Sequence, residues 1–336
     1  MATHPRGERR APARPSGRLP GRLRRTVLAG LVSAAVAASV VGAARPVDVP
    51  APVPPAVAPL TPAGTTELAA ELAERYGAER AALRDAARTA RAHGARHRAE
   101  ALTAMATAER SFLSFDGRDG GRGIEVVGDL ARADRIAVLV PGVDTTIDSY
   151  GRLQRGAVAL QKELGPRAAV VAWLDYRTPA TGSAASVTPG RADQAARTLH
   201  SFVDELHRVR PDARLTLLGH SYGSVVCALA APGLPVAGIV LYGSPGTSLD
   251  RAADLRTRAT VWAGRASGDW VAEVPHVSVP LPAGSRLGFG TDPVDPAFGA
   301  RRFAAGDGGH SDYLAPGSVP LRNLARIVDG QEPDRA

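Results

Sequence analysis

The sequence has very little cysteine, lysine or aromatic side chain. Among its 336 residues there are one cysteine, Cys227, and one lysine, Lys162, and aromatic residues make up 4%. A single thiol cannot form an intramolecular disulfide, and it cannot supply a metal site built from several cysteines. We therefore expect no disulfide framework, no metal and no cofactor, and a fold stabilised by packing.

Excess positive charge is nearly absent from most of the chain, although the net charge is +8. Residues 1–25 contain eight Arg and one Glu, so this leader holds +7 of the total. The rest of the chain is almost neutral, which argues against a nucleic-acid partner. The composition, with 44% hydrophobic and 22% charged residues, is ordinary for a globular protein. The chain is long enough for one large domain and a smaller appendage.

Residues 1–44 have the three parts of an export signal. The arginine-rich start precedes an uncharged run of 19 residues at 26–44, and Val41-Gly42-Ala43 offers small residues for cleavage. Arg24-Arg25 before an Ala-rich run also fits a twin-arginine signal, so Sec and Tat export both stay open. If uncleaved, residues 26–44 are long enough to anchor the protein in the cytoplasmic membrane. Either outcome predicts an exported protein, extracellular or in the cell envelope, which contacts the membrane only through this segment and only if the segment is uncleaved.

Two further segments precede the main domain. Residues 45–64 are rich in proline and predict a stiff, extended linker. Residues 65–111 are rich in Ala, Arg and Glu and predict one or two amphipathic helices, with Thr66 able to cap the first. Since this segment has little apolar area, we expect it to pack on the main domain or to stay mobile. His93 and His97 are four residues apart, but without a glutamate after His93 we interpret them as a solvated helix face.

Residues 112–332 predict an α/β domain, with a mostly parallel sheet and helices on both of its faces. Short apolar runs alternate with longer helical patterns, as in a parallel sheet with crossover helices. We expect strands at 123–129, 135–141, 168–176, 214–220, 237–244 and 259–266, and helices at 148–164, 191–209, 222–231 and 321–328.

One G-x-S-x-G pattern, Gly219 to Gly223, is the strongest sign of chemistry. The letters alone are weak evidence, because chance matches occur in a glycine-rich chain. Here the pattern follows a predicted strand and opens an apolar helix, as a nucleophile elbow does. The flanking glycines leave room for a sharp turn that exposes the serine hydroxyl. We therefore expect Ser221 to be the nucleophile, and not Ser311, which follows a glycine-rich turn.

A serine nucleophile needs a base, and the base needs an acid. In this type of fold the chain order is Ser, acid, His. Of the two histidines that follow at a useful distance, His310 is favoured over His276, which comes too soon after the acid. Asp269, where a predicted strand enters a loop, is the favoured acid. Its rivals are interpreted as turn-forming carboxylates: Asp292, Asp295 and Asp307.

Acyl transfer also needs N–H donors for the oxyanion. We expect these to be the backbone N–H groups of Tyr222 and of Val143, which follows Gly142 after the second predicted strand. Asp144 is next in the chain, where a carboxylate would oppose the developing charge. We expect it to turn away and to cap the helix that begins near Asp148. Cys227, two turns into the helix after Ser221, is expected to be a buried, inert thiol.

Residues from about 111 to 330 resemble an actinobacterial, exported α/β-hydrolase family long described only as a domain of unknown function. The matching segments are AVLVPGVDTTID (137–148), VAWLDY (171–176), LLGHSYGS (217–224), GSPG (243–246), TDPVDPAFGARRF (291–303) and GHSDYLAPGSVPLRNLARIV (309–328). The resemblance implies the α/β-hydrolase fold, with Ser221 as nucleophile and His310 as base. It implies the acid less firmly and supplies no substrate.

The leading functional hypothesis is an exported serine hydrolase that cleaves carboxylic esters, small or lipid-like, through an acyl-enzyme. Amides and thioesters are close variants, and a peptidase is less favoured. The alternatives are a non-catalytic binding protein of the cell envelope on a hydrolase fold, and a lipid-handling protein at the membrane surface. Substrate identity and oligomeric state are not readable from the sequence.

Overall fold

The computed structural model describes Met1 and residues 49–56, 58–61, 64–280 and 286–336. The predicted export signal, its cleavage site and the membrane-anchor segment at 26–44 lie outside the described residues. Within the described ranges, no helix has both the length and the apolar character needed to cross a bilayer.

The centre of the domain is an eight-stranded sheet with the order β1-β2-β4-β3-β5-β6-β7-β10. Strands β3 to β7 and β10 pair in parallel, whereas β1 pairs antiparallel with β2, and β2 pairs antiparallel with β4. The predicted α/β fold with a mostly parallel sheet is confirmed. The strands are β1 (Ser111–Asp116), β2 (Arg122–Val127), β3 (Arg135–Val140), β4 (Ala168–Leu174), β5 (Arg214–His220), β6 (Gly238–Tyr242), β7 (Thr260–Gly264) and β10 (Arg301–Arg302).

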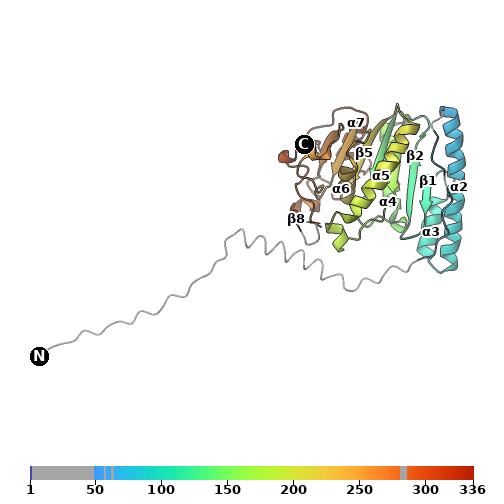
Figure 1. Ribbon diagram of the computed structural model, residues 1–336, viewed down its shortest axis with the longest axis horizontal. Helices are drawn as coiled ribbons and strands as arrows, with labels where there is room; N and C mark the ends of the chain where they lie inside the picture. The colour runs from blue at the N-terminus through green and yellow to red at the C-terminus, as the bar shows by residue number, and fades with distance from the viewer. Residues whose placement is uncertain (2–48, 57, 62–63, 281–285) are drawn as a thin grey trace. The chain divides into compact units, whose positions relative to one another are not determined.

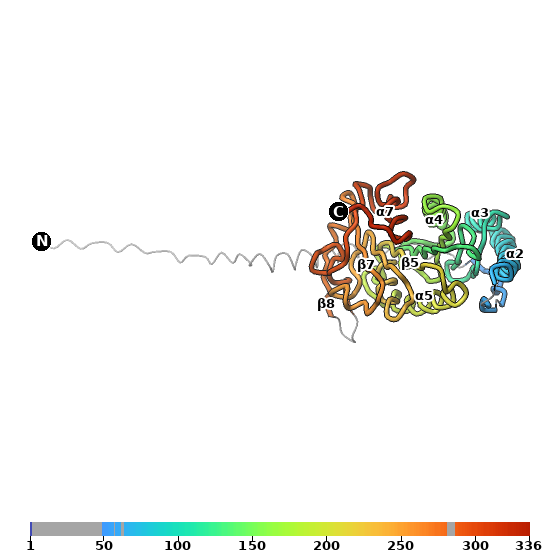
Figure 2. The backbone as a smooth tube through the Cα atoms, turned by 90° about the horizontal axis from the view of Figure 1, so that it is seen from above, coloured from blue at the N-terminus to red at the C-terminus, as the bar shows by residue number. Residues whose placement is uncertain are grey.

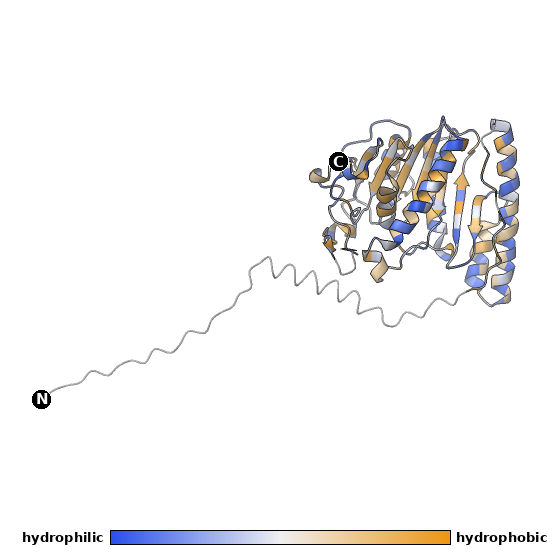
Figure 3. Ribbon diagram, in the orientation of Figure 1, coloured by the Kyte–Doolittle hydropathy of each residue, from blue (hydrophilic) through white to orange (hydrophobic). Residues whose placement is uncertain are grey.

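Helices cover both faces of this sheet (Figure 2). Helices α4 (Gly151–Leu164) and α7 (Val319–Val328) pack together on one face, and α5 (Gly190–Val209) and α6 (Tyr222–Ala230) on the other. On α5 the buried residues recur every three or four positions, from Ala192 through Leu199 and Val203 to Leu206, and the other side of the helix faces solvent. The central strands are apolar throughout, because both faces are covered (Figure 3).

The N-terminal segment packs beside the first strand (Figure 1). It forms α2 (Thr65–Ala92) and α3 (Arg96–Met105), and the break between them includes Gly94 with a φ of 74°. The expected cap at Thr66 is wrong, because the helix begins one residue earlier and its N-cap is Gly64. Leu68 and Leu72 enter one hydrophobic cluster, and alanines further along α2 enter a second. Small alanines allow close packing on the domain, and the described residues from 49 onward belong to one compact unit.

The described part of the proline-rich linker also contacts the domain. Leu60 is buried, and its N–H donates to Glu205 Oε1 on α5 at 2.9 Å. Arg75 on α2 donates to the carbonyl of Ala58. At least the C-terminal part of the predicted spacer is therefore docked.

Candidate active site

Ser221 lies at the sharp turn between β5 and α6. Its φ of 53° and ψ of −126° are strained for a residue with a side chain. A Cβ on Gly219 would lie 2.7 Å from Ser224 Cα, and one on Gly223 would lie 2.7 Å from Pro141 O. Glycines at these two positions therefore let the strand, turn and helix approach closely enough to present Ser221 at the carboxyl edge of the sheet.

Asp269 and His310 are brought together from two loops, 41 residues apart in the chain. His310 Nδ1 lies 2.9 Å from Oδ1 and 3.0 Å from Oδ2 of Asp269, whose side chain is fully buried. Burial raises the pKa of this carboxyl, but hydrogen bonds from His310, Tyr313 and the Val271 N–H outweigh burial and lower the pKa to about 2. An ionised carboxylate can only accept, so Nδ1 of His310 carries the hydrogen of this bond; in the neutral imidazole this tautomer leaves a free lone pair on Nε2.

Ser221 and His310 line the same cavity, which has a volume of about 360 Å³. No hydrogen bond joins them, and among the described residues Ser221 Oγ has no hydrogen-bond partner at all. Bonds of this kind are often long in the absence of substrate. Trp270 is 56% exposed at the cavity, with its ring centroid 4.8 Å from that of His310. Leu153 and Leu314 are among the apolar residues of the cavity wall.

His220 holds the backbone of His310 in place. Its Nε2–H donates to the His310 carbonyl at 2.7 Å, and the two ring centroids are 4.6 Å apart. Burial and the neighbouring His310 lower the pKa of His220 to about 3, so this ring is neutral near neutral pH. The residue before Ser221 thus holds the loop that carries His310.

The N–H groups of Val143 and Tyr222 are available as donors. Val143 lies in the cavity wall, and Tyr222 is the first residue of α6, directly after Ser221. Within the part of the chain that the structure describes, neither N–H donates to another protein group. A Cβ on Gly142 would lie 3.1 Å from Ser221 Oγ, so a side chain there would occupy the space beside the hydroxyl.

Asp144 lines the cavity together with Val143, and its side chain bonds to a neighbouring loop without capping a helix. The expected capping role is wrong: Thr146 is the N-cap of the short helix at 147–149. The carboxylate instead accepts from the N–H of Thr181 at 2.9 Å and from its hydroxyl. This contact could not be predicted from local sequence, because Thr181 lies 37 residues further along the chain.

Two of the rival acids have partners away from His310. Asp292 pairs with Arg265 and lies 3.7 Å from His276 Nε2, and Asp295 accepts from the Ala297 N–H at 2.8 Å as a helix cap. Ser311 lines the cavity but is exposed. Cys227 is buried, and burial raises the pKa of its thiol. His93 and His97 are both exposed. Among the described residues no group of three His, Cys, Asp or Glu could hold a metal ion.

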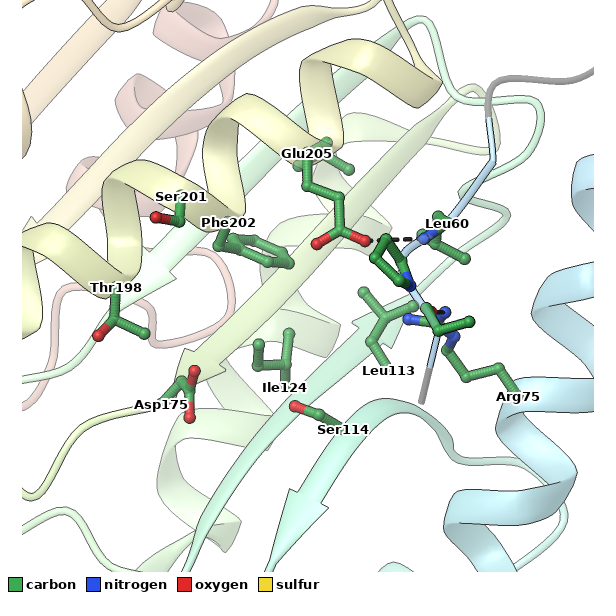
Figure 4. Close-up of a pocket in the computed structure, with 13 residues that line it drawn as sticks. Leu60, Arg75, Leu113, Ser114, Ile124, Asp175, Thr198, Ser201, Phe202 and Glu205 are labelled. Atoms are coloured by element: carbon green, nitrogen blue, oxygen red, sulfur yellow. Dashed lines mark hydrogen bonds between the residues drawn. The ribbon is translucent and has the colours of Figure 1, made fainter. Parts of the chain in front are cut away.

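A second cavity lies on the α5 side of the sheet (Figure 4). Its volume is about 330 Å³, and it is bounded by the docked linker, α2, β1, β2 and α5. Burial raises the pKa of Asp175, on its wall, to about 6. Neither Ser221 nor His310 lines this cavity, so it is separate from the candidate active site.

Besides the Asp144–Thr181 bonds, two contacts of the candidate site were not predicted from the sequence. Tyr313 Oη donates to Asp269 Oδ2 at 2.6 Å, and His220 bonds to His310 as described above. The partners of these residues lie 44 and 90 residues away in the chain, respectively, so local pattern gives no sign of either contact. The only available signal was position, since His220 adjoins the elbow and Tyr313 follows His310 by three residues.

The chain is similar to a known protein family and to two mycobacterial proteins. Residues 116–279, which include Ser221 and Asp269, match the family model described as alpha/beta hydrolase. One uncharacterized protein of Mycobacterium tuberculosis is 37% identical over 147 residues, covering 38% of this chain and 54% of the relative. A second from the same species is 29% identical over 271 residues, covering 71% of this chain and 41% of the relative. The chain thus spans about half the length of the curated relatives it matches.

Among solved structures, the chain is similar to a serine hydrolase without a lid from Xanthomonas campestris. The identity is 17% and the TM-score 0.42, and the match covers 66% of this chain and 94% of that one. The mycobacterial relatives and the family model confirm the predicted resemblance to an actinobacterial α/β-hydrolase family.

Proposed function

We propose that this protein, whose residues 116–279 match the alpha/beta hydrolase family model, is a serine hydrolase that cleaves carboxylic esters through an acyl-enzyme. The match to this family model supports a hydrolase. The triad and the ester substrate are our proposal, and the observation that carries them is the buried Asp269 carboxyl bonded to His310, which lines the same cavity as the strained Ser221.

In the first half of the reaction, Ser221 Oγ attacks the ester carbonyl carbon while His310 Nε2 takes the hydroxyl proton. Asp269 stabilises the resulting imidazolium, and the N–H groups of Val143 and Tyr222 donate to the carbonyl oxygen as it becomes negative. The tetrahedral intermediate collapses by breaking the bond to the alkoxy oxygen, which takes the proton from His310. In the second half, water repeats these steps and releases the acid and free Ser221.

An ester is favoured over an amide because an alkoxide leaves more readily than an amide nitrogen, and His310 is the one acid we assign to the leaving group. The cavity volume of about 360 Å³ suits a small or medium acyl group. Leu153, Leu314 and the exposed Trp270 favour an apolar one.

A fluorophosphonate probe tests this proposal, because it reacts only with an activated serine. We expect the wild type to be labelled, Ser221→Ala to lose labelling completely, and His310→Ala and Asp269→Ala to lose most of it. Ser311→Ala is the matched control, since this serine lines the same cavity directly after His310. Labelling that survives in Ser221→Ala refutes the proposed nucleophile.

The competing function is a non-catalytic binding protein of the cell envelope. It predicts that the folded wild type is not labelled at all and does not hydrolyse a panel of p-nitrophenyl esters. The ionised Asp269 beside His310 favours the enzyme, since a binding site has no need for this buried pair.

We also propose that the protein is exported, on the basis of the arginine-rich start and uncharged run at 1–44. Fractionation of cells that express the full chain tests export, and Arg24→Lys with Arg25→Lys distinguishes Tat from Sec. Retention of the wild type in the cytoplasm contradicts this proposal and leaves the hydrolase proposal untouched.

A further inference from the structure

Asp144 has a left-handed backbone at the residue after the proposed oxyanion donor, Val143. Its φ is 57°, a conformation that Gly, Asn and Asp adopt more readily than other residues. Its N–H donates to the carbonyl of Pro179 at 3.0 Å. The backbone turn that directs the Val143 N–H is therefore fixed against a second loop.

The side chain adds two more bonds to the same loop. Thr181 donates its N–H to Oδ1 of Asp144 at 2.9 Å and its hydroxyl to Oδ2. A fourth bond runs in parallel, from the Thr178 hydroxyl to the carbonyl of Thr145 at 2.9 Å. Residues 144–145 and 178–181 together form what we call the loop tether.

We propose that Asp144 is a positioning residue, which holds the Val143 N–H toward the developing oxyanion by means of the loop tether. This inference rests on the proposed function. It explains why a carboxylate occurs where its charge would oppose an oxyanion: both oxygens are engaged by neutral donors of Thr181, so the group acts as a double acceptor.

Substitutions at Asp144 and Thr181 can distinguish the effect of the Asp144 backbone conformation from the effects of its hydrogen bonds and of its charge. Asp144→Gly keeps the left-handed backbone and removes the side-chain bonds, and Thr181→Val removes one donor. Asp144→Asn keeps the backbone preference and one acceptor, and its amide can donate to the Thr181 hydroxyl, so the bonds remain without the charge. Asp119→Gly is the matched control, because Asp119 also has a positive φ, 52°, but lies in an exposed turn.

The test measures kcat and KM on a p-nitrophenyl ester, and the inhibition constant of an alkyl trifluoromethyl ketone, whose adduct with serine places an oxyanion in the site. For Asp144→Gly and Thr181→Val we expect kcat to fall about tenfold or more, KM to stay within about twofold, and the ketone to bind more weakly by a factor similar to that in kcat. Asp144→Asn should stay within about threefold of the wild type, and Asp119→Gly should match it.

Hydrogen exchange provides a readout that does not depend on activity. In Asp144→Gly, amides of residues 143–146 and 178–181 should exchange faster than in the wild type, and those of α6 should not. An active wild type together with an equally active Asp144→Gly overturns this inference alone. An Asp144→Asn variant as slow as Asp144→Gly also overturns it, since the charge and not the tether would then matter. A wild type that fluorophosphonate does not label refutes the proposed function itself.

Discussion

Tyr313 donates its hydroxyl hydrogen to Oδ2 of Asp269 at 2.6 Å, three residues after the histidine that the same carboxylate holds. The Ala266 N–H in turn donates to the Tyr313 oxygen at 3.1 Å. One loop thus supplies both the proposed base and a support for its acid.

Tyr313→Phe should destabilise the protein at neutral pH and slow hydrolysis. The substitution removes a hydrogen bond to a buried ionised group and leaves the Ala266 N–H without its partner, so we expect a loss of about 2 kcal/mol in the free energy of unfolding. Urea unfolding at neutral pH measures it.

Tyr242→Phe is the control for this change. Tyr242 is buried in the same aromatic cluster, with its ring centroid 5.1 Å from that of Tyr313, but its hydroxyl has no hydrogen-bond partner among the described residues. Equal losses in the two variants would show that the bond to Asp269 contributes nothing beyond packing.

The pKa of His220, lowered from 6.5 to about 3, predicts a loss of stability in acid. Below pH 6.5 the unfolded chain takes up a proton at this residue, whereas the folded protein does not until about pH 3, so unfolding binds a proton and is favoured as the pH falls. At about pH 5 this difference costs the wild type about 2 kcal/mol.

His220→Gln keeps a donor near the His310 carbonyl and cannot titrate. Its free energy of unfolding should therefore fall less than that of the wild type between neutral pH and about pH 5. His200→Gln is the control, since His200 also bonds to a carbonyl, Ala230 O at 3.0 Å, but its side chain is 38% exposed. If His220→Gln and the wild type lose stability in parallel, His220 does not carry the effect.

Asp175 predicts the opposite pH dependence. Burial raises the pKa of this carboxyl from 3.8 to about 6, and among the described residues no group hydrogen-bonds to it. The folded protein therefore binds a proton more tightly than the unfolded chain, and stability falls as the pH rises from about 4 through 6. Asp175→Asn should raise the free energy of unfolding at neutral pH by about 1–3 kcal/mol and have little effect near pH 4.

Asp212→Asn, at an exposed position, is the comparison for Asp175→Asn and should be neutral at both pH values. A destabilised Asp175→Asn at neutral pH would mean that the ionised carboxylate has a partner in solution and is not a source of strain.

The sequence predicted the parts of this protein whose signals are local. An apolar run, a glycine-flanked serine and a second apolar run were enough for β5, Ser221 and α6, because strand, turn and helix depend on neighbouring residues. Strand β1 was missed because its burial does not alternate: Phe112 and Leu113 are both buried at an irregularity in the strand, so these residues look like the end of the helical segment before them. Strand β10 has two residues and exists only by pairing with β7.

Whether a contact around the site could be predicted depended on how far apart its residues lie in the chain. The Asp269–His310 pair was predictable from chain order and residue type, because a serine nucleophile needs both groups. The bonds of Tyr313, His220 and Asp144 were not, because each joins loops whose approach is decided by the sheet order and not by nearby sequence.

Gly142 offers the sharpest test of the space beside the nucleophile. A Cβ at this position would lie 2.7 Å from Ser221 Cβ and 3.2 Å from the His220 carbonyl, and neither neighbour can move without disturbing the elbow. Gly142→Ala should therefore lower kcat/KM by about a hundredfold or more and abolish fluorophosphonate labelling, because the added methyl group blocks the carbonyl from the Val143 N–H.

Gly156→Ala is the matched control within the same cavity. The added Cβ there would lie 2.7 Å from Leu314 Cδ1, the flexible end of a side chain that can move aside. We expect this variant to keep labelling and to change KM more than kcat, since it narrows the acyl side of the cavity and leaves the elbow intact. If Gly142→Ala is labelled as fast as Gly156→Ala while both stay folded, the oxyanion is not held at the Val143 loop and a different second donor must be sought.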